Sequence, residues 1–145
     1  MAKQQYSNHV RYYIPHHFVF YPVVLFILVI CVKNWLGSPE NKTEWLVMAV
    51  LTALLCFLSF MTRQHYALVN QNRTVRLEMR LRYYQLTQKR FEVLEQRLVF
   101  NQIAALRFAG DGELIPLIDR TLAENLQPAA IKKLITDWQP DYMRV

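Results

Sequence analysis

The chain is poor in the residues that carry out chemistry inside a membrane or on a substrate. Its two long apolar blocks, residues 18–36 and 45–61, contain no aspartate or glutamate. Because ionisable groups within membrane segments mark proton relays and ion pathways, their absence argues against an ion-coupled transporter. The sequence also has no HExxH, CxxC or glycine-rich phosphate-binding motif, and neither Ser38 nor Ser59 has a base nearby in the sequence. We therefore expect no enzymatic activity, no catalytic residue and no cofactor.

Only two cysteines are present, Cys31 and Cys56, one in each apolar block. If the blocks form antiparallel helices, Cys31 lies five residues before the end of its block at Leu36. Cys56 lies eleven residues after the start of the next block at Trp45. At about 1.5 Å per residue their depths differ by roughly 9 Å, which exceeds the ~7 Å Cα separation that a disulfide allows. We expect both to be small apolar side chains without a disulfide.

The two apolar blocks are long enough to cross a bilayer. The first runs from Phe18 to Leu36 with one charge, Lys33. The second runs from Trp45 to Met61 with none. Both fall in the range of about 17–25 residues that spans a hydrocarbon core. A globule of this size could not cover two helices that are apolar on every face, and the first block is longer than the core of a cleaved signal peptide. The sequence predicts two membrane spans.

Basic residues indicate the orientation of these spans. Between the spans, Lys33 and Lys42 are balanced by Glu40 and Glu44. The arginines that follow the second span within about twenty residues are Arg63, Arg73, Arg76, Arg80 and Arg82. Since loops rich in lysine and arginine stay in the cytoplasm, we expect both chain termini to be cytoplasmic.

No proline or glycine occurs from Arg63 to Phe108, and this segment is rich in good helix formers. The sequence therefore predicts a long basic helix there, which either continues the second span or folds back on itself. Apolar residues recur in it at steps of three, four or seven, as in coiled-coil packing. Gln88, Glu95 and Gln102 interrupt this repeat, so a regular leucine zipper is not expected.

Two shorter amphipathic helices are expected after the basic helix. Asp111 is the predicted N-cap of the first, which ends near Asn125, and Pro128 opens the second. Each has an apolar face that must be covered. Residues 63–108 hold nine basic and three acidic residues, whereas residues 109–145 hold four basic and six acidic ones. We expect this helical hairpin to lie across the basic helix, within one subunit or between two.

Two sets of residues are the predicted contacts of the chain with other molecules. Those for self-association or a partner protein are Leu77, Leu81, Tyr84, Phe91, Leu98, Leu117, Ile131, Leu134 and Trp138. Those for anionic lipid headgroups are Arg63, Arg73, Arg76 and Arg80. A basic residue close to an anionic membrane surface gains about 1 kcal/mol. An anionic-lipid-sensing regulator is therefore one alternative function.

The histidines suggest another alternative, an interfacial metal- or haem-binding protein. His9, His16 and His17 precede the first span and His65 follows the second, so all four are expected near the cytoplasmic interface. Such a site needs imidazoles that are oriented by further hydrogen-bond partners. Adjacent histidines on a helix point about 100° apart, and no carboxylate lies near them in the sequence. We therefore expect interfacial hydrogen bonding rather than a metal at these residues.

Segments at both ends of the chain carry a family likeness. The first half contains Tyr6-Ser7-Asn8-His9 and Tyr12-Tyr13-Ile14-Pro15-His16-His17-Phe18. The second half contains Gln102-Ile103-Ala104-Ala105-Leu106-Arg107-Phe108-Ala109, Ile131-Lys132-Lys133, Trp138, Asp141-Tyr142 and Arg144-Val145. In these segments the chain resembles a bacterial family of small two-span membrane proteins of unknown function. The resemblance covers nearly the whole chain, agrees with the architecture above and implies no activity.

These features predict an all-α protein with a transmembrane helical hairpin, a long cytoplasmic helix and a C-terminal helical hairpin. The expected segments, in chain order, are an interfacial segment (1–17), a first span (18–36), an outer loop (37–44), a second span (45–62), the basic helix (63–108) and the C-terminal helical hairpin (109–145). We expect a non-enzymatic scaffold or accessory subunit of a bacterial inner membrane, which self-associates or binds a membrane complex. Its expected partners are anionic lipids and protein. Nucleic acid is not expected, since the hairpin has a net charge of −2.

Overall fold

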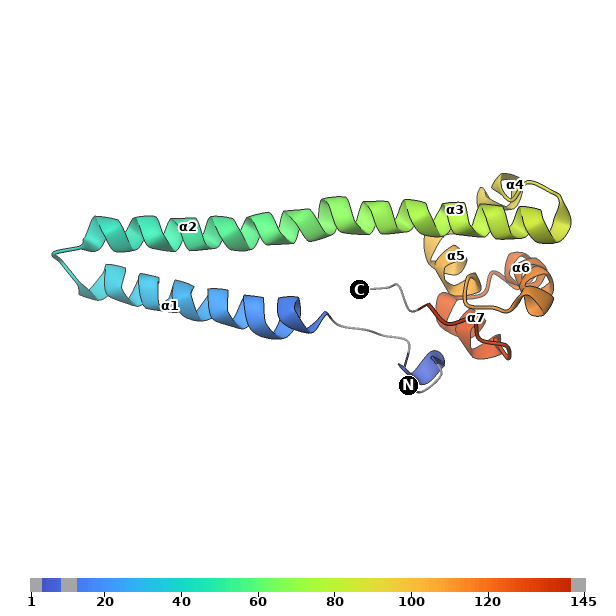
Figure 1. Cartoon of the computed structure of the whole chain (residues 1–145), viewed down its shortest axis with the longest axis horizontal. Coiled ribbons are helices and arrows are strands. Elements are labelled where there is room, and N and C mark those ends of the chain that lie inside the picture. The colour runs from blue at the N-terminus through green and yellow to red at the C-terminus, as the bar shows by residue number, and fades with distance from the viewer. Residues whose placement is uncertain (1–3, 9–12, 142–145) are drawn as a thin grey trace. The chain divides into compact units, whose positions relative to one another are not determined.

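The computed structural model describes residues 4–8 and 13–141 (Figure 1). Within these residues the chain forms helices and no β-strand, which confirms the predicted all-α class. The chain divides into two compact units. One is a hairpin of long helices within residues 12–69. The other, here called the C-terminal unit, is formed by residues 70–141 with the described N-terminal residues 4–8.

The helical hairpin consists of α1 (Tyr21–Gly37) and α2 (Lys42–Met61), joined by a short turn (Figure 1). With the preceding turn of helix, the first arm is helical from Pro15 to Gly37, a length of about 34 Å. The predicted spans fall inside these helices. The loop is shorter than the expected residues 37–44, because helix begins at Lys42 with Glu44 in its first turn, where a carboxylate is favourable.

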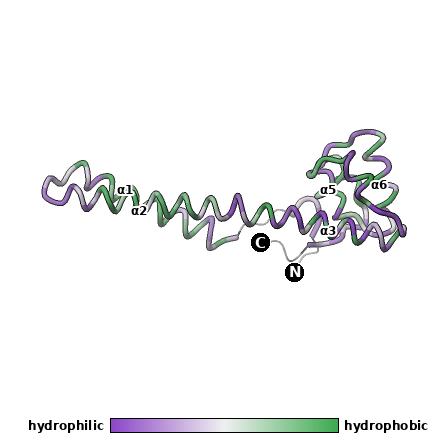
Figure 2. Tube along the Cα trace, turned by 90° about the horizontal axis from the view of Figure 1, so that it is seen from above, coloured by the Kyte–Doolittle hydropathy of each residue, from purple (hydrophilic) through white to green (hydrophobic). Residues whose placement is uncertain are grey.

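Large apolar side chains cover the outside of this hairpin, and Figure 2 shows its hydrophobic colouring along both helices. Leu25 and Phe26 are more than 60% exposed, and Leu54 in α2 is 56% exposed. The buried residues are the small Cys31, Ala49 and Thr52. Small residues let two helices approach closely without a large interface. Both helices are therefore long and apolar enough to cross a membrane.

Each arm of the hairpin has a segment of wider π-helix at the same end. The segment η2 (Pro15–Phe20) precedes α1, and the segment η3 (Thr62–Ala67) follows α2. The N–H of Tyr21 donates to the carbonyl of His16, five residues back. Pro22, which has no N–H to donate, comes directly after this wide turn. A proline within a helix distorts the turn that precedes it, and the wide turn before Pro22 accommodates this distortion.

The C-terminal unit starts with α3 (Leu68–Thr87), and helical backbone is continuous from Lys42 to Thr87. Of the two alternatives for residues 63–108, the helix therefore continues the second apolar helix as far as Thr87, and the chain then folds back. Gln88 adopts a left-handed conformation with φ 57°, and its N–H donates to the Tyr84 carbonyl, which ends the helix. The chain then turns back through α4 (Glu92–Glu95) and α5 (Phe100–Leu106).

The next two helices are α6 (Asp111–Glu124) and α7 (Pro128–Leu134). Gly110 is the N-cap of α6, so the predicted cap at Asp111 is one residue too late. Gly110 also has a steric role, since an added Cβ would lie 2.0 Å from Asp137 Oδ2. Helix α6 ends at Asn125, which has a positive φ of 49°.

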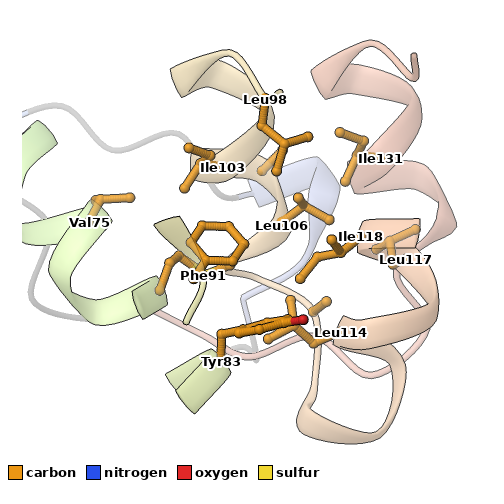
Figure 3. Close-up of a cluster of buried hydrophobic side chains, with 13 residues drawn as sticks. Val75, Tyr83, Phe91, Leu98, Ile103, Leu106, Leu114, Leu117, Ile118 and Ile131 are labelled. Atoms are coloured by element: carbon orange, nitrogen blue, oxygen red, sulfur yellow. The ribbon is translucent and has the colours of Figure 1, made fainter. Parts of the chain in front are cut away.

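A single hydrophobic core joins α3 to the four helices that follow it (Figure 3). Its fully covered side chains include Phe91, Ile103, Leu106, Leu114 and Ile131, each 0% exposed. The ring of Phe91 lies 5.3 Å from that of Tyr83 on α3, measured between centroids. The C-terminal hairpin therefore packs on the basic helix within one chain, one of the two arrangements that the sequence left open.

The described N-terminal residues 4–8 pack on the C-terminal unit. The side chain of Gln4 is buried, and its Oε1 accepts a 2.7 Å hydrogen bond from the N–H of Asp141. Lys133 Nζ lies 6.0 Å from the centre of the Tyr6 ring. Buried polar groups need such partners, and the C-terminal unit supplies them.

Candidate functional site

Helix α3 has apolar residues on two opposite faces. Val75, Met79 and Tyr83 are at most 8% exposed and belong to the core. At 100° per residue, the opposite face of the helix is centred on Leu77 and Leu81. An amphipathic helix at a protein surface normally has one apolar face. The second apolar face on α3 is therefore the feature of this unit that packing within the chain does not explain.

The exposed face, here called the outer stripe, consists of Leu77, Leu81 and Tyr84. These side chains are 62%, 60% and 50% exposed, and they follow one another at steps of four and three residues. Single exposed leucines are common on protein surfaces, but a contiguous apolar row marks an interaction site. The outer stripe is the part of the predicted contact set that stays available to another molecule.

The other residues predicted to contact a partner lie within the chain's own core. Phe91, Leu98, Leu117, Ile131 and Trp138 are 8% exposed or less, and Leu134 is half-buried against the core. The structure corrects the prediction for these six residues. Phe91 and Leu98 continue the spacing of the outer stripe at steps of seven residues, but the turn at Gln88 reverses the chain and directs them inward.

The four arginines predicted to contact lipid fall into two pairs. Arg63 and Arg73 are exposed. Arg76 and Arg80 both bind the buried carboxylate of Glu95, with Arg80 Nε 2.7 Å from Oε2. Burial alone would raise the pKa of Glu95, but the hydrogen bonds from Arg80 and Arg76 outweigh it and hold this pKa below its usual range. Arg76 and Arg80 therefore hold α4 against α3.

Arg82 joins α3 to the turn between α5 and α6, a role that the sequence did not reveal. Its Nε donates to Asp111 Oδ1 at 2.6 Å, and its Nη atoms donate to the carbonyls of Arg107 and Ala109 at 3.1 and 2.5 Å. The planar guanidinium can satisfy three acceptors at once. In the sequence, Arg82 is one of five arginines after the second span, and nothing in its spacing marks it as different.

Glu113, in the first turn of α6, binds the segment that follows α7. Its carboxylate accepts hydrogen bonds from the Thr136 hydroxyl at 2.7 Å and from the backbone N–H groups of Thr136 and Asp137 at 3.1 Å. Desolvation would raise the pKa of Glu113, but these hydrogen bonds and that from the Gly110 N–H outweigh it and lower the pKa. The contact fixes the segment after α7 to the start of α6.

The histidines do not converge on one point in the described part of the chain. His16 packs edge-on against Tyr21, with 4.7 Å between ring centroids, and His17 Nδ1 donates to the Tyr13 carbonyl at 3.1 Å. His65 is exposed on η3, and His9 lies outside the described residues. Within residues 4–8 and 13–141, no three His, Cys, Asp or Glu residues are grouped so that they could hold a metal ion.

A surface hollow of about 260 Å³ lies between the beginning of α3, α5 and α7. Asn72 and Asn101 contribute amides to it, and Arg107 and Lys132 contribute positive charge. Arg107 is already bound to Asp141 through Nη2 at 2.7 Å. The charge of Arg107 is therefore balanced within the chain.

Comparison with known proteins gives the chain a family. A family model matches residues 1–145, which is the whole sequence. The chain belongs to DUF6526, a family of unknown function. No curated protein and no solved structure matches it. The family match agrees with the whole-chain resemblance described above, and it assigns no chemistry to any of these residues.

Proposed function

We propose that this chain is a non-enzymatic scaffold or accessory subunit that is anchored in a membrane and holds proteins together through its C-terminal unit. The observation that carries the proposal is the outer stripe of α3. The core of the C-terminal unit is filled, yet Leu77, Leu81 and Tyr84 remain largely exposed on one side of the same helix. A surface of this kind serves binding rather than folding.

The proposed anchor is the hairpin of α1 and α2. Its large apolar side chains are exposed, and both arms reach the length of a hydrocarbon core. The turn between the helices carries little net charge, while the arginines follow α2. We propose a bacterial inner membrane with both termini in the cytoplasm, which is the orientation that the positive-inside rule favours.

The polar groups of the C-terminal unit support a structural role. Arg82, Glu95 and Glu113 each bind several groups of the same unit. The buried Gln102 donates to Asn125 Oδ1 and to the Leu126 carbonyl, and its Oε1 accepts from the Val99 N–H. Polar side chains with such complete partners stabilise a fold. A catalytic group, by contrast, must keep a free position for substrate.

Anionic lipid headgroups are the proposed secondary partner. Arg63 is exposed in the turn of helix directly after α2, and Arg73 is exposed ten residues further along. Such residues contribute about 1 kcal/mol each near an anionic surface. The contribution of Arg76 and Arg80 is expected to be smaller, because their side chains are already bound to Glu95.

Cross-linking of the full chain in native membranes, followed by alkaline carbonate extraction and mass spectrometry, tests this function. The chain should stay with the membrane and cross-link to protein. The double variant Leu77→Gln/Leu81→Gln should lose most of that product. The control Val93→Gln changes a side chain that is 68% exposed but lies outside the stripe, and it should not. Release by carbonate, or monomers alone with nothing co-purifying, would contradict the proposal.

A further inference from the structure

The spacing of the outer stripe matches the seam of a two-stranded coiled coil. Leu77, Leu81 and Tyr84 occupy successive d, a and d positions of a heptad. In that register Arg73 is at a g position and Glu78 is at the following e position, on either side of the stripe. Both are exposed. These are the positions where coiled coils place the charges that select a partner.

We propose that the outer stripe pairs with the outer stripe of a second copy of this chain, parallel and in register. The inference deepens the proposed function and rests on it, because two copies inserted in one membrane have the same orientation. A two-fold axis along the membrane normal then places each residue of the stripe opposite its own equivalent. Leu81 of one copy meets Leu81 of the other at the centre of the contact.

Charge complementarity identifies the second copy as the occupant. In a parallel coiled coil, a g residue faces the e residue that lies five positions later on the other helix. Arg73 would therefore face Glu78 of the second copy, and symmetry repeats this pair on the other side. Within the described residues, neither side chain takes part in another ion pair or side-chain hydrogen bond. Self-pairing would satisfy both charges.

Neighbouring positions limit the contact to this short length. The next g residue is Arg80, which already binds Glu95 of its own chain, and its e counterpart is the uncharged Gln85. Thr74 and Gln88 are polar residues at the a positions before and after the stripe. The register is thus fixed by one layer each of Leu77, Leu81 and Tyr84, with both ion pairs beside the Leu77 layer.

A contact this short is weak by itself, and membrane anchoring compensates for that. Stable interfaces between soluble proteins bury about 1,600 Å² in total, far more than three side chains on each copy can provide. Two chains held in one bilayer with the same orientation have already lost most of their relative freedom. Their effective concentration is correspondingly high. A short, specific seam is therefore sufficient for pairing in the membrane.

Cysteine cross-linking of the full chain in native membranes tests the pairing and its direction. In a Cys31→Ala/Cys56→Ala background, Leu81→Cys should form a disulfide-linked dimer under mild oxidation. Ala123→Cys, an exposed position on α6, should not. Parallel pairing links Leu77→Cys chains to one another. Antiparallel pairing would instead link Leu77→Cys chains to Leu81→Cys chains, and that result would overturn the proposal.

Charge reversal tests the register. With Leu81→Cys present, Arg73→Glu or Glu78→Arg alone should lower the yield of dimer about three- to tenfold, since each reversal breaks both symmetric pairs. The double reversal should restore the yield. Failure of the double variant to recover, or insensitivity to either single change, would refute the Arg73–Glu78 pairing.

The same experiment separates this inference from the proposed function. If Leu81→Cys cross-links only to a different protein, the second copy is the wrong occupant while the scaffold proposal stands. If the position cross-links to nothing and the chain washes off the membrane with carbonate, both proposals fail.

Discussion

The helical hairpin and the C-terminal unit use large apolar side chains in opposite ways. In α1 and α2 such side chains point outward, and the residues buried between the helices are small. In the C-terminal unit Phe91, Leu106 and Ile118 are fully covered, and the buried side chains of Glu95 and Gln102 are hydrogen-bonded within the unit. The two patterns fit two solvents, because lipid accepts an apolar surface that water does not.

The outer stripe of α3 is an exception, because its large apolar side chains are exposed although they belong to the C-terminal unit. Leu77 in α3 is as exposed as Leu54 in α2, at 62% and 56%, although it lies within the basic part of the chain. The comparison separates three kinds of leucine: those in a core, those exposed on the outside of the helical hairpin and those on the stripe. Substitutions can tell these classes apart, because each class responds to a different measurement.

The largest effect is expected in the core. Phe91→Ala removes a ring that is 0% exposed, and it should lower the free energy of unfolding of the C-terminal unit by about 3–5 kcal/mol. The exposed control Val93→Ala should change it by less than about 0.5 kcal/mol. Pulse proteolysis of the full chain in detergent micelles and urea measures both. Equal effects of the two substitutions would show that the core is not packed as described.

A lysine should separate the exposed leucine of the helical hairpin from the stripe leucine. Leu54→Lys places a charge near the centre of α2 and should cost about 2.5–3.5 kcal/mol of insertion energy. It should therefore lower the fraction of the chain that stays in the membrane after alkaline extraction. Leu77→Lys, at similar exposure, should leave that fraction unchanged while reducing cross-linked dimer. A loss of membrane retention with both variants would contradict the distinction between the two helices.

Sequence patterns were sufficient to predict the apolar helices and the helix-rich tail. They also identified the positions where the heptad repeat is broken, Gln88, Glu95 and Gln102. Each break has a structural cause. Gln88 forms the turn after α3, Glu95 binds two arginines, and Gln102 bonds to the end of α6. The break at Gln88 therefore marks the place where the chain reverses, although no glycine or proline signals it.

The partners of these polar residues could not be predicted in the same way. Arg82 binds the turn around Ala109, some twenty-seven residues later, and Glu95 binds Arg76, nineteen residues earlier. Such contacts depend on how the helices pack in three dimensions, and periodicity along one helix carries no information about them. The outer stripe was predicted because it needs only the spacing within a single helix.

Acid should weaken the C-terminal unit through Glu95 and Glu113. The pKa of each carboxyl group is lower in the folded protein than in the unfolded chain. The stabilisation from each group is therefore complete above the unfolded carboxyl pKa of about 4.3. It is lost as the pH falls through the pKa of the folded protein. Unfolding free energy should therefore decrease below about pH 4–5. A pH titration of urea stability in micelles measures this effect.

Glu95→Gln tests how much of that acid effect comes from Glu95. At neutral pH this substitution should lower the free energy of unfolding by about 1–2 kcal/mol. This is the lower part of the range for charged hydrogen bonds, because the Arg76 and Arg80 side chains are 36% and 38% exposed to solvent. It should also flatten the acid response. Asp119→Asn, at an exposed position of α6, controls for the loss of one negative charge. A Glu95→Gln variant with an unchanged acid response would contradict the assignment.

The smallest expected effect is at the turn where α3 ends. A residue other than glycine at positive φ carries a backbone cost, so Gln88→Gly should stabilise the C-terminal unit by about 0.5–1 kcal/mol. Gln85→Gly, three residues earlier within α3, should destabilise it by up to about 1 kcal/mol. The opposite signs follow from the reversal of the chain at Gln88, because in an uninterrupted helix both glycines would be unfavourable. Destabilisation by both, measured by pulse proteolysis, would mean that the helix continues past Thr87 and that the core residues beyond it extend the outer stripe.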